Sequence, residues 1–156
     1  IVDSLVGSEM CIRDSYVTGL SQIGIRNVSS TARVGYEDAK KMGADIQSVR
    51  QFRDLGVSGM IARIPKGQRF YLTIDIDGFD PSIASGTGTP SHGGFLYYEI
   101  LEFLDALTKH GDIIGIDLVE VAPDYDLTGS TATLAAQLLL NLIGRIHHNR
   151  KNDAGK

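Results

Sequence analysis

The chain has 156 residues, a net charge of −4 and an apolar content of 42%, which is typical of one globular domain with its own core. The acidic balance argues against nucleic acid and anionic membranes as partners, and no apolar run is long enough to span a bilayer. The single cysteine, Cys11, excludes an internal disulfide framework, so we expect a cytoplasmic protein, or a mitochondrial-matrix protein in a eukaryote.

The first fifteen residues show neither helical nor strand periodicity. Residues 4–15 also resemble a peptide that arises when sequencing-adapter DNA is translated by mistake. We therefore expect 1–15 to be a sequencing or translation artefact, with an irregular native arm as the alternative. Residues 16–150 are expected to form one domain, and 151–156 a frayed tail.

Strand and helix patterns alternate through the first half of this domain. A short buried strand is predicted at Gln22–Arg26, and a helix at about Ala32–Met42. Residues 46–49 suit another short strand, whereas 48–55 suit the start of a helix equally well. Residues 56–67 fit a loop or a helix that ends in a turn.

The second half has stronger patterns. Phe70–Ile76 alternates apolar and polar residues as a strand does, and Ile113–Val121 is almost continuously apolar, as expected for a parallel strand buried on both faces. Helices are predicted at Tyr97–Lys109 and Thr131–His147, and a long loop at 78–94. This alternation predicts an α/β fold with a parallel sheet covered by helices.

Two carboxylates follow the strongest strand. Because side chains in a strand repeat every two residues, Asp75 and Asp77 are predicted to point to the same face. Such close anions repel each other unless a cation lies between them, and ligands of parallel sheets gather at this edge. Glu120 follows the next strong strand and should reach the same edge. The alternative for each carboxylate is a solvated turn residue at a strand end.

The motifs around these carboxylates resemble the ureohydrolase family of agmatinase and arginase. Their sequences are closer to agmatinase-like members than to arginase itself. The resemblance covers residues 21–144 and rests on three blocks. The first, at 72–94, contains Leu-Thr-Ile-Asp-Ile-Asp-Gly-Phe-Asp-Pro, Gly-Thr-Gly-Thr-Pro and Gly-Gly. The second lies at 115–123, and the third is Thr131-Ala132 with the helix that follows.

This resemblance implies a three-layer α/β/α fold, here incomplete, and two Mn²⁺ ions that activate water for attack on a guanidinium carbon. Asp75 would then bridge both ions and Asp77 would bind one, while Glu120 would pair with the substrate guanidinium and Thr89 would line the pocket. The products would be an amine and urea. The resemblance also implies a homo-oligomer, a trimer or hexamer, for the intact protein.

Two further aspartates near the predicted metal ligands are expected to have structural roles. Asp80 is expected to fix the loop through backbone N–H groups. Asp117 lies three residues before Glu120, so in a straight strand it would face the other side of the sheet.

The family's two upstream blocks of metal ligands, Gly-Gly-Asp-His and Asp-Ala-His-X-Asp, do not occur in this chain, whose first histidine is His92. We therefore interpret the sequence as the C-terminal half of a ureohydrolase, assign it no catalytic residue, and expect the chain alone to be inactive. One alternative is a non-catalytic ureohydrolase-like subunit. Another is a nucleotide-sugar transferase, which also uses Asp-X-Asp but does not require residues 86–90.

Overall fold

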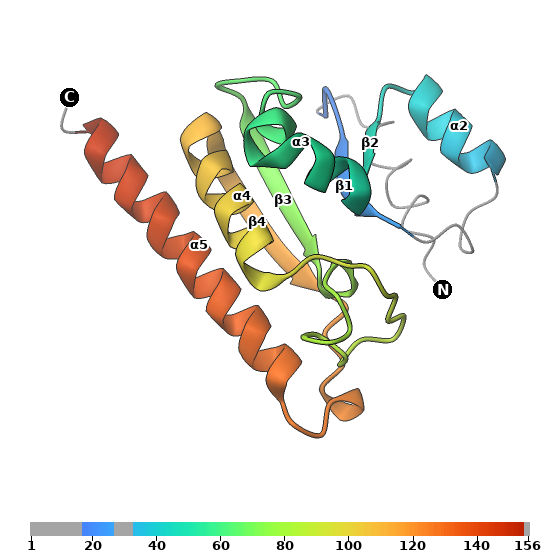
Figure 1. The fold of residues 1–156 in the computed structure, drawn as a ribbon. Coiled ribbons are helices and arrows are strands. Elements are labelled where there is room, and N and C mark those ends of the chain that lie inside the picture. Colours follow the sequence, from blue (N-terminus) through green and yellow to red (C-terminus); the bar gives the residue numbers. More distant parts are fainter. Residues whose placement is uncertain (1–16, 27–32, 155–156) are drawn as a thin grey trace. The chain divides into compact units, whose positions relative to one another are not determined.

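The computed structural model describes residues 17–26 and 33–154, which form two units that divide between Phe52 and Arg53 (Figure 1). Residues 1–15, interpreted above as an artefact or an irregular arm, lie outside the described residues. Among the helices that are described, none combines the length and apolar character that a membrane span needs.

The first unit is a parallel strand pair with one helix between the strands. Strand β1 (Ser21–Ile25) pairs with β2 (Asp45–Ser48), and helix α2 (Arg33–Lys41) connects them. A small core forms where Ala39, Ala44 and Ile46 pack with the partly buried Leu20 and Ile25. The predicted strand and helix of this region are therefore confirmed.

The ambiguity at 46–55 resolves into a strand followed directly by a helix. Helix α3 (Val49–Ile61) begins at the residue after β2. Ser48 and Gln51 form a capping box: the amide of Ser48 donates to the Gln51 side-chain oxygen (2.8 Å), and the amide of Gln51 donates to the Ser48 hydroxyl (3.1 Å). Gly56, with φ 67° and ψ 176°, kinks α3 in the region where loop and helix were both considered.

The second unit holds the stronger strand pair. Strand β3 (Arg69–Asp75) pairs in parallel with β4 (Asp112–Val119), and α4 (Tyr97–His110) connects them. Helix α5 (Ser130–Ala154) follows and lies alongside α4, and both helices contact β4 (Figure 1). The predicted α/β fold with parallel strands is confirmed in both units.

Burial alternates along β3, so one face of this strand pair is covered and the other is open. Ile74 is 8% exposed and Ile113 4%, whereas Tyr71 is 65% exposed and Ile114 57%. The prediction that the second strand is buried on both faces is therefore wrong for the described residues. The reason is that this described sheet has two strands, with α4 and α5 packed against it.

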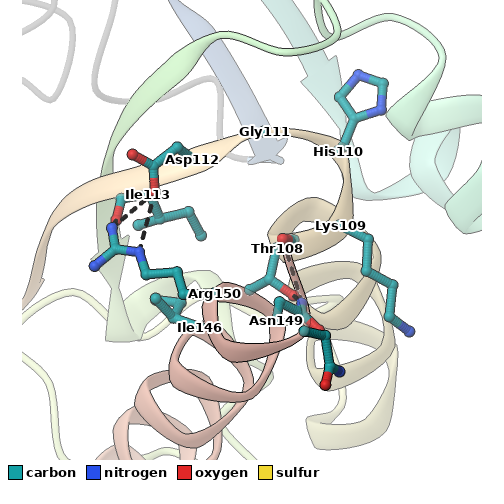
Figure 2. Close-up of a pocket in the computed structure, with 10 residues that line it drawn as sticks. Thr108, Lys109, His110, Gly111, Asp112, Ile113, Ile146, Asn149 and Arg150 are labelled. Atoms are coloured by element: carbon teal, nitrogen blue, oxygen red, sulfur yellow. Dashed lines mark hydrogen bonds and ion pairs between the residues drawn. The ribbon is translucent and has the colours of Figure 1, made fainter. Parts of the chain in front are cut away.

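Helix α5 extends beyond the predicted end at His147 and is helical through Ala154, where a frayed tail was expected. Side chains of its last turns attach it to the sheet and to α4. Arg150 donates to the Asp112 carboxylate (2.7 Å) and to the carbonyl of Ile113 (2.9 Å), and Asn149 donates to the hydroxyl of Thr108 (2.9 Å) (Figure 2).

Candidate functional site

The two predicted metal ligands lie at the carboxyl end of β3, but they do not share a strand. Strand β3 ends at Asp75, and Ile76–Gly78 forms a turn of 3₁₀ helix. The Asp75 carboxylate caps this turn by accepting a hydrogen bond of 3.0 Å from the amide of Asp77. The prediction that both side chains follow strand periodicity is thus wrong for Asp77, because the chain leaves the strand before it.

A contact from the long loop completes this cluster. The hydroxyl of Thr89 donates a hydrogen bond of 2.8 Å to Oδ2 of Asp77. Asp75, Asp77 and Thr89 are thereby joined by two consecutive hydrogen bonds. The sequence predicted Thr89 near a substrate pocket but did not predict its hydrogen bond to Asp77, a predicted metal ligand. The structure therefore brings three of the four predicted site residues together.

The loop that carries Thr89 is closed at its base. The amide of Phe95 donates to the carbonyl of Gly78 (3.0 Å), and the amide of Asp80 donates to the carbonyl of Phe95 (2.9 Å). Gly94 packs so closely that a Cβ there would collide with the backbone of Phe79. The loop therefore begins and ends at fixed points.

The carboxylate of Asp80 provides the second closure, as predicted. It accepts hydrogen bonds from the amide of Ser82 (3.0 Å) and the amide of Gly93 (2.9 Å). Hydrogen bonds from the hydroxyl and amide of Ser82, with smaller contributions from Gly93 and Gly94, lower the pKa of Asp80 to about 2. Asp80 is consequently ionised at neutral pH and fixes the loop.

Sequence reasoning missed a further clamp at the end of the loop. The guanidinium of Arg53 donates to both carboxylate oxygens of Glu99 (2.8 and 3.0 Å) and to the carbonyl of Gly94 (2.8 Å). Glu99 also accepts from the amide of Leu96 (2.7 Å), which caps the start of α4. These bonds raise the pKa of Arg53 and lower the pKa of Glu99. The only signal in the sequence was Glu99 at the third position of a helix.

Glu120 stands one residue beyond the pair Asp75–Val119, so it follows β4 at the edge where Asp75 ends β3. It is exposed, and its φ of 65° is the one positive φ among the described non-glycine residues. A left-handed conformation costs a side-chain-bearing residue about 1–3 kcal/mol and clusters at functional sites. The positive φ therefore marks Glu120 as a candidate functional residue.

Asp117 lies on the face of the sheet that carries Asp75. It pairs in register with Thr73, two residues before Asp75, and therefore lies on the same face of the sheet as Asp75. Its Oδ2 accepts a hydrogen bond of 3.0 Å from the Tyr71 hydroxyl, which raises the pKa of Tyr71. The argument from a straight strand does not apply, because Glu120 lies outside β4.

The donor chemistry of Asp75 and Asp77 suits a hard divalent ion such as Mn²⁺, since carboxylate oxygens are its preferred ligands. Within residues 17–26 and 33–154, however, no group of three or more His, Cys, Asp or Glu side chains could hold a metal ion. The two aspartates thus fit part of a ligand set. A cavity of about 580 Å³ lies elsewhere, at the amino end of β4 beside Arg150 (Figure 2), and includes none of the predicted site residues.

Comparison with known proteins identifies the family. The sequence model of the arginase family matches residues 8–144. The chain belongs to the arginase family. It is 36% identical to guanidinobutyrase of Pseudomonas aeruginosa over 125 residues, which is 78% of this chain and 39% of that protein. It is 37% identical to proclavaminate amidinohydrolase of Streptomyces clavuligerus over 137 residues, 83% of this chain and 42% of that protein.

Solved structures agree with this family assignment. The chain matches agmatine ureohydrolase of Thermoplasma volcanium with a TM-score of 0.74 and 30% identity, over 85% of this chain and 44% of that one. The resemblance to ureohydrolases and the arginase-like fold are thus confirmed. The chain spans about two fifths of the length of these relatives. The family also disfavours the nucleotide-sugar transferase alternative.

Proposed function

We propose that this chain is the C-terminal part of a manganese-dependent amidinohydrolase that converts an agmatine-like guanidino compound to an amine and urea. The observation that carries the proposal is the cluster of Asp75, Asp77 and Thr89 at the carboxyl end of β3, joined by hydrogen bonds of 3.0 and 2.8 Å. In open parallel sheets, this edge is where ligands bind. The activities for which these relatives are named support the reaction class.

In this proposal each residue has one task. Asp75 and Asp77 contribute carboxylate oxygens to a pair of Mn²⁺ ions, whose other ligands come from residues that this chain does not contain. The chemistry supplied by such a pair is a water molecule of lowered pKa. Glu120 accepts two parallel hydrogen bonds from the planar guanidinium of the substrate. Thr89 orients Asp77, because its hydroxyl donates to the carboxylate.

The proposed substrate class rests on the names of the relatives. They include a guanidinobutyrase, an agmatine ureohydrolase and a proclavaminate amidinohydrolase. We choose agmatine as the first candidate because the motifs resemble agmatinase-like members more than arginase itself. With that substrate the protein would act in polyamine metabolism. We further propose that the intact protein is a homo-oligomer, a trimer or hexamer, in the cytoplasm or, in a eukaryote, in the mitochondrial matrix.

The test measures urea release by the complete polypeptide that carries this sequence, with Mn²⁺ added, from agmatine and from 4-guanidinobutyrate. We expect Asp75→Asn and Asp77→Asn to lower kcat/KM by at least 100-fold, since each removes a charged ligand. Asp124, an exposed carboxylate in another 3₁₀ turn, provides the matched control, and Asp124→Asn should retain activity. Unchanged kcat/KM in Asp77→Asn would contradict the proposed role.

A further inference from the structure

Three backbone segments meet at Gly86. Its amide donates a hydrogen bond of 2.9 Å to the hydroxyl oxygen of Thr131, at the start of α5. Its carbonyl accepts a hydrogen bond of 2.8 Å from the amide of Ala122, two residues after Glu120. Gly86 is buried and Thr131 is 1% exposed, so the hydrogen bond between them lies away from solvent. The loop, the end of β4 and the start of α5 are therefore tied at one point.

Thr131 is itself held by a buried carboxylate. Its amide donates to Oδ2 of Asp126 (2.6 Å), while the other oxygen of Asp126 accepts from the hydroxyl (2.6 Å) and the amide (3.0 Å) of Thr128. Bonds from Thr128 and Thr131 lower the pKa of Asp126 below its ordinary range. Because Asp126 is 7% exposed and fully engaged on both oxygens, it fixes the position of Thr131.

Only glycine fits at the meeting point. A Cβ on residue 86 would lie 2.7 Å from Cβ of Asp126 and 3.0 Å from the hydroxyl oxygen of Thr131. The missing side chain thus lets the backbone amide approach Thr131 to hydrogen-bonding distance. Thr89 follows Gly86 by three residues, and Glu120 precedes Ala122 by two.

We propose that Thr131 is a positioning residue that, through its bond to Gly86, fixes the separation between the loop carrying Thr89 and the strand end carrying Glu120. The inference rests on the proposed function, in which Thr89 orients a metal ligand and Glu120 binds the guanidinium. Thr131 would touch neither metal nor substrate. It acts through Gly86, whose two hydrogen bonds transmit the position of α5 to both sides of the site.

The first experiment measures amide hydrogen exchange at Gly86 by NMR in the 156-residue chain. In the unmutated chain this amide should be protected from exchange with solvent. Thr131→Val keeps the shape but removes the acceptor, so exchange at Gly86 should rise roughly 5- to 100-fold. Thr131→Ser keeps a hydroxyl and should restore protection to within about threefold of the unmutated chain.

Two threonines supply matched controls. Thr133 lies one half-turn along α5, is exposed and donates to the carbonyl of Gly129. Thr108 is buried and hydrogen-bonded at the far end of α4. Thr133→Val and Thr108→Val should leave exchange at Gly86 unchanged. If Thr131→Val also leaves it unchanged, or if Thr108→Val accelerates it equally, the anchor is overturned.

The second experiment tests position with Mn²⁺ alone as the probe, in the complete polypeptide that carries this sequence and the remaining metal ligands. Trace Mn²⁺ at Asp75 and Asp77 broadens nearby amide signals steeply with proximity, so the ratio of broadening at Thr89 and Glu120 reports their separation from the ion. We expect Thr131→Val to change this ratio at least twofold, and Thr131→Ser to preserve it. If Gly86 loses protection in Thr131→Val while the broadening ratio of Thr89 to Glu120 stays unchanged, the positioning role of Thr131 is overturned. Absence of Mn²⁺ broadening at Thr89 in the unmutated complete polypeptide would count against the proposed function, while the exchange data still test the anchor.

Discussion

The hydroxyl of Thr89 reaches across twelve residues of loop to donate a hydrogen bond of 2.8 Å to the carboxylate of Asp77. If Asp77 binds Mn²⁺ as proposed, this hydrogen bond would orient a metal ligand, and loss of such a bond typically weakens metal binding 10- to 100-fold. Because Thr89 is exposed, we expect the lower end of this range, roughly 10-fold, for Thr89→Val. Electron paramagnetic resonance of free Mn²⁺ measures the affinity of the complete polypeptide for the ion. Thr89→Ser is the control that keeps the hydroxyl.

The chain alone should release no urea from agmatine. Two carboxylates cannot complete a site for two ions that each take about six ligands, and the described residues contain no larger cluster. A colorimetric urea assay with added Mn²⁺ measures the outcome against an intact agmatinase. Turnover comparable with that enzyme would show that residues 1–156 supply the whole site.

The two glycines at opposite sides of the loop should respond differently to alanine. A Cβ on Gly94 would collide with the backbone of Phe79, whereas a Cβ on Gly88 meets nothing within 4 Å. We expect Gly94→Ala to lower the free energy of unfolding by about 2 kcal/mol or more, and Gly88→Ala to stay within about 0.5 kcal/mol. Urea denaturation followed by circular dichroism measures both. Equal stability of the two variants would contradict the close packing at Gly94.

The Arg53 clamp should contribute more than an ordinary surface ion pair. Arg53 makes three hydrogen bonds, two to Glu99 and one to the carbonyl of Gly94, although its side chain is 44% exposed. We expect Arg53→Ala to lower the free energy of unfolding by about 1 kcal/mol. Arg33, which pairs with Glu37 on the surface of α2, is the matched control, and Arg33→Ala should change it by less than about 0.5 kcal/mol.

Stability should fall with acid through the titration of Asp80. Its pKa in the folded protein is about 2, below the ordinary value of 3.8, so the unfolded chain binds more protons between these values. The stabilisation from the ionised carboxylate is therefore complete above pH 3.8 and is lost as the pH falls toward 2. Denaturant melts at half-unit pH steps measure this slope. Asp80→Asn should flatten it, Ser82→Ala should flatten it in part, and parallel curves would exclude the role of Asp80.

Local sequence pattern was sufficient for most of the strands and helices and for the family motif, but it left residues 46–67 open between alternatives. The alternation at 70–76 depends only on backbone geometry, so it predicted the strand to within one residue at each end. The predicted loop role of Asp80 was also confirmed, since an Asp before a proline binds nearby backbone amides. The order and spacing of the family blocks can be read from the sequence, so they were sufficient to predict the arginase-like fold.

Tertiary structure decided what these residues touch. Strand periodicity placed Asp77 on the wrong element, because the Asp75 carboxylate caps a turn that ends the strand there. The bonds from Thr89 to Asp77 and from Gly86 to Thr131 join residues 12 and 45 positions apart, and no local pattern encodes them. The sequence therefore determined which functional side chains are present, while tertiary packing determined their hydrogen-bond partners. The reason is that secondary-structure propensity acts over a few neighbouring residues, whereas these contacts join residues far apart in the chain.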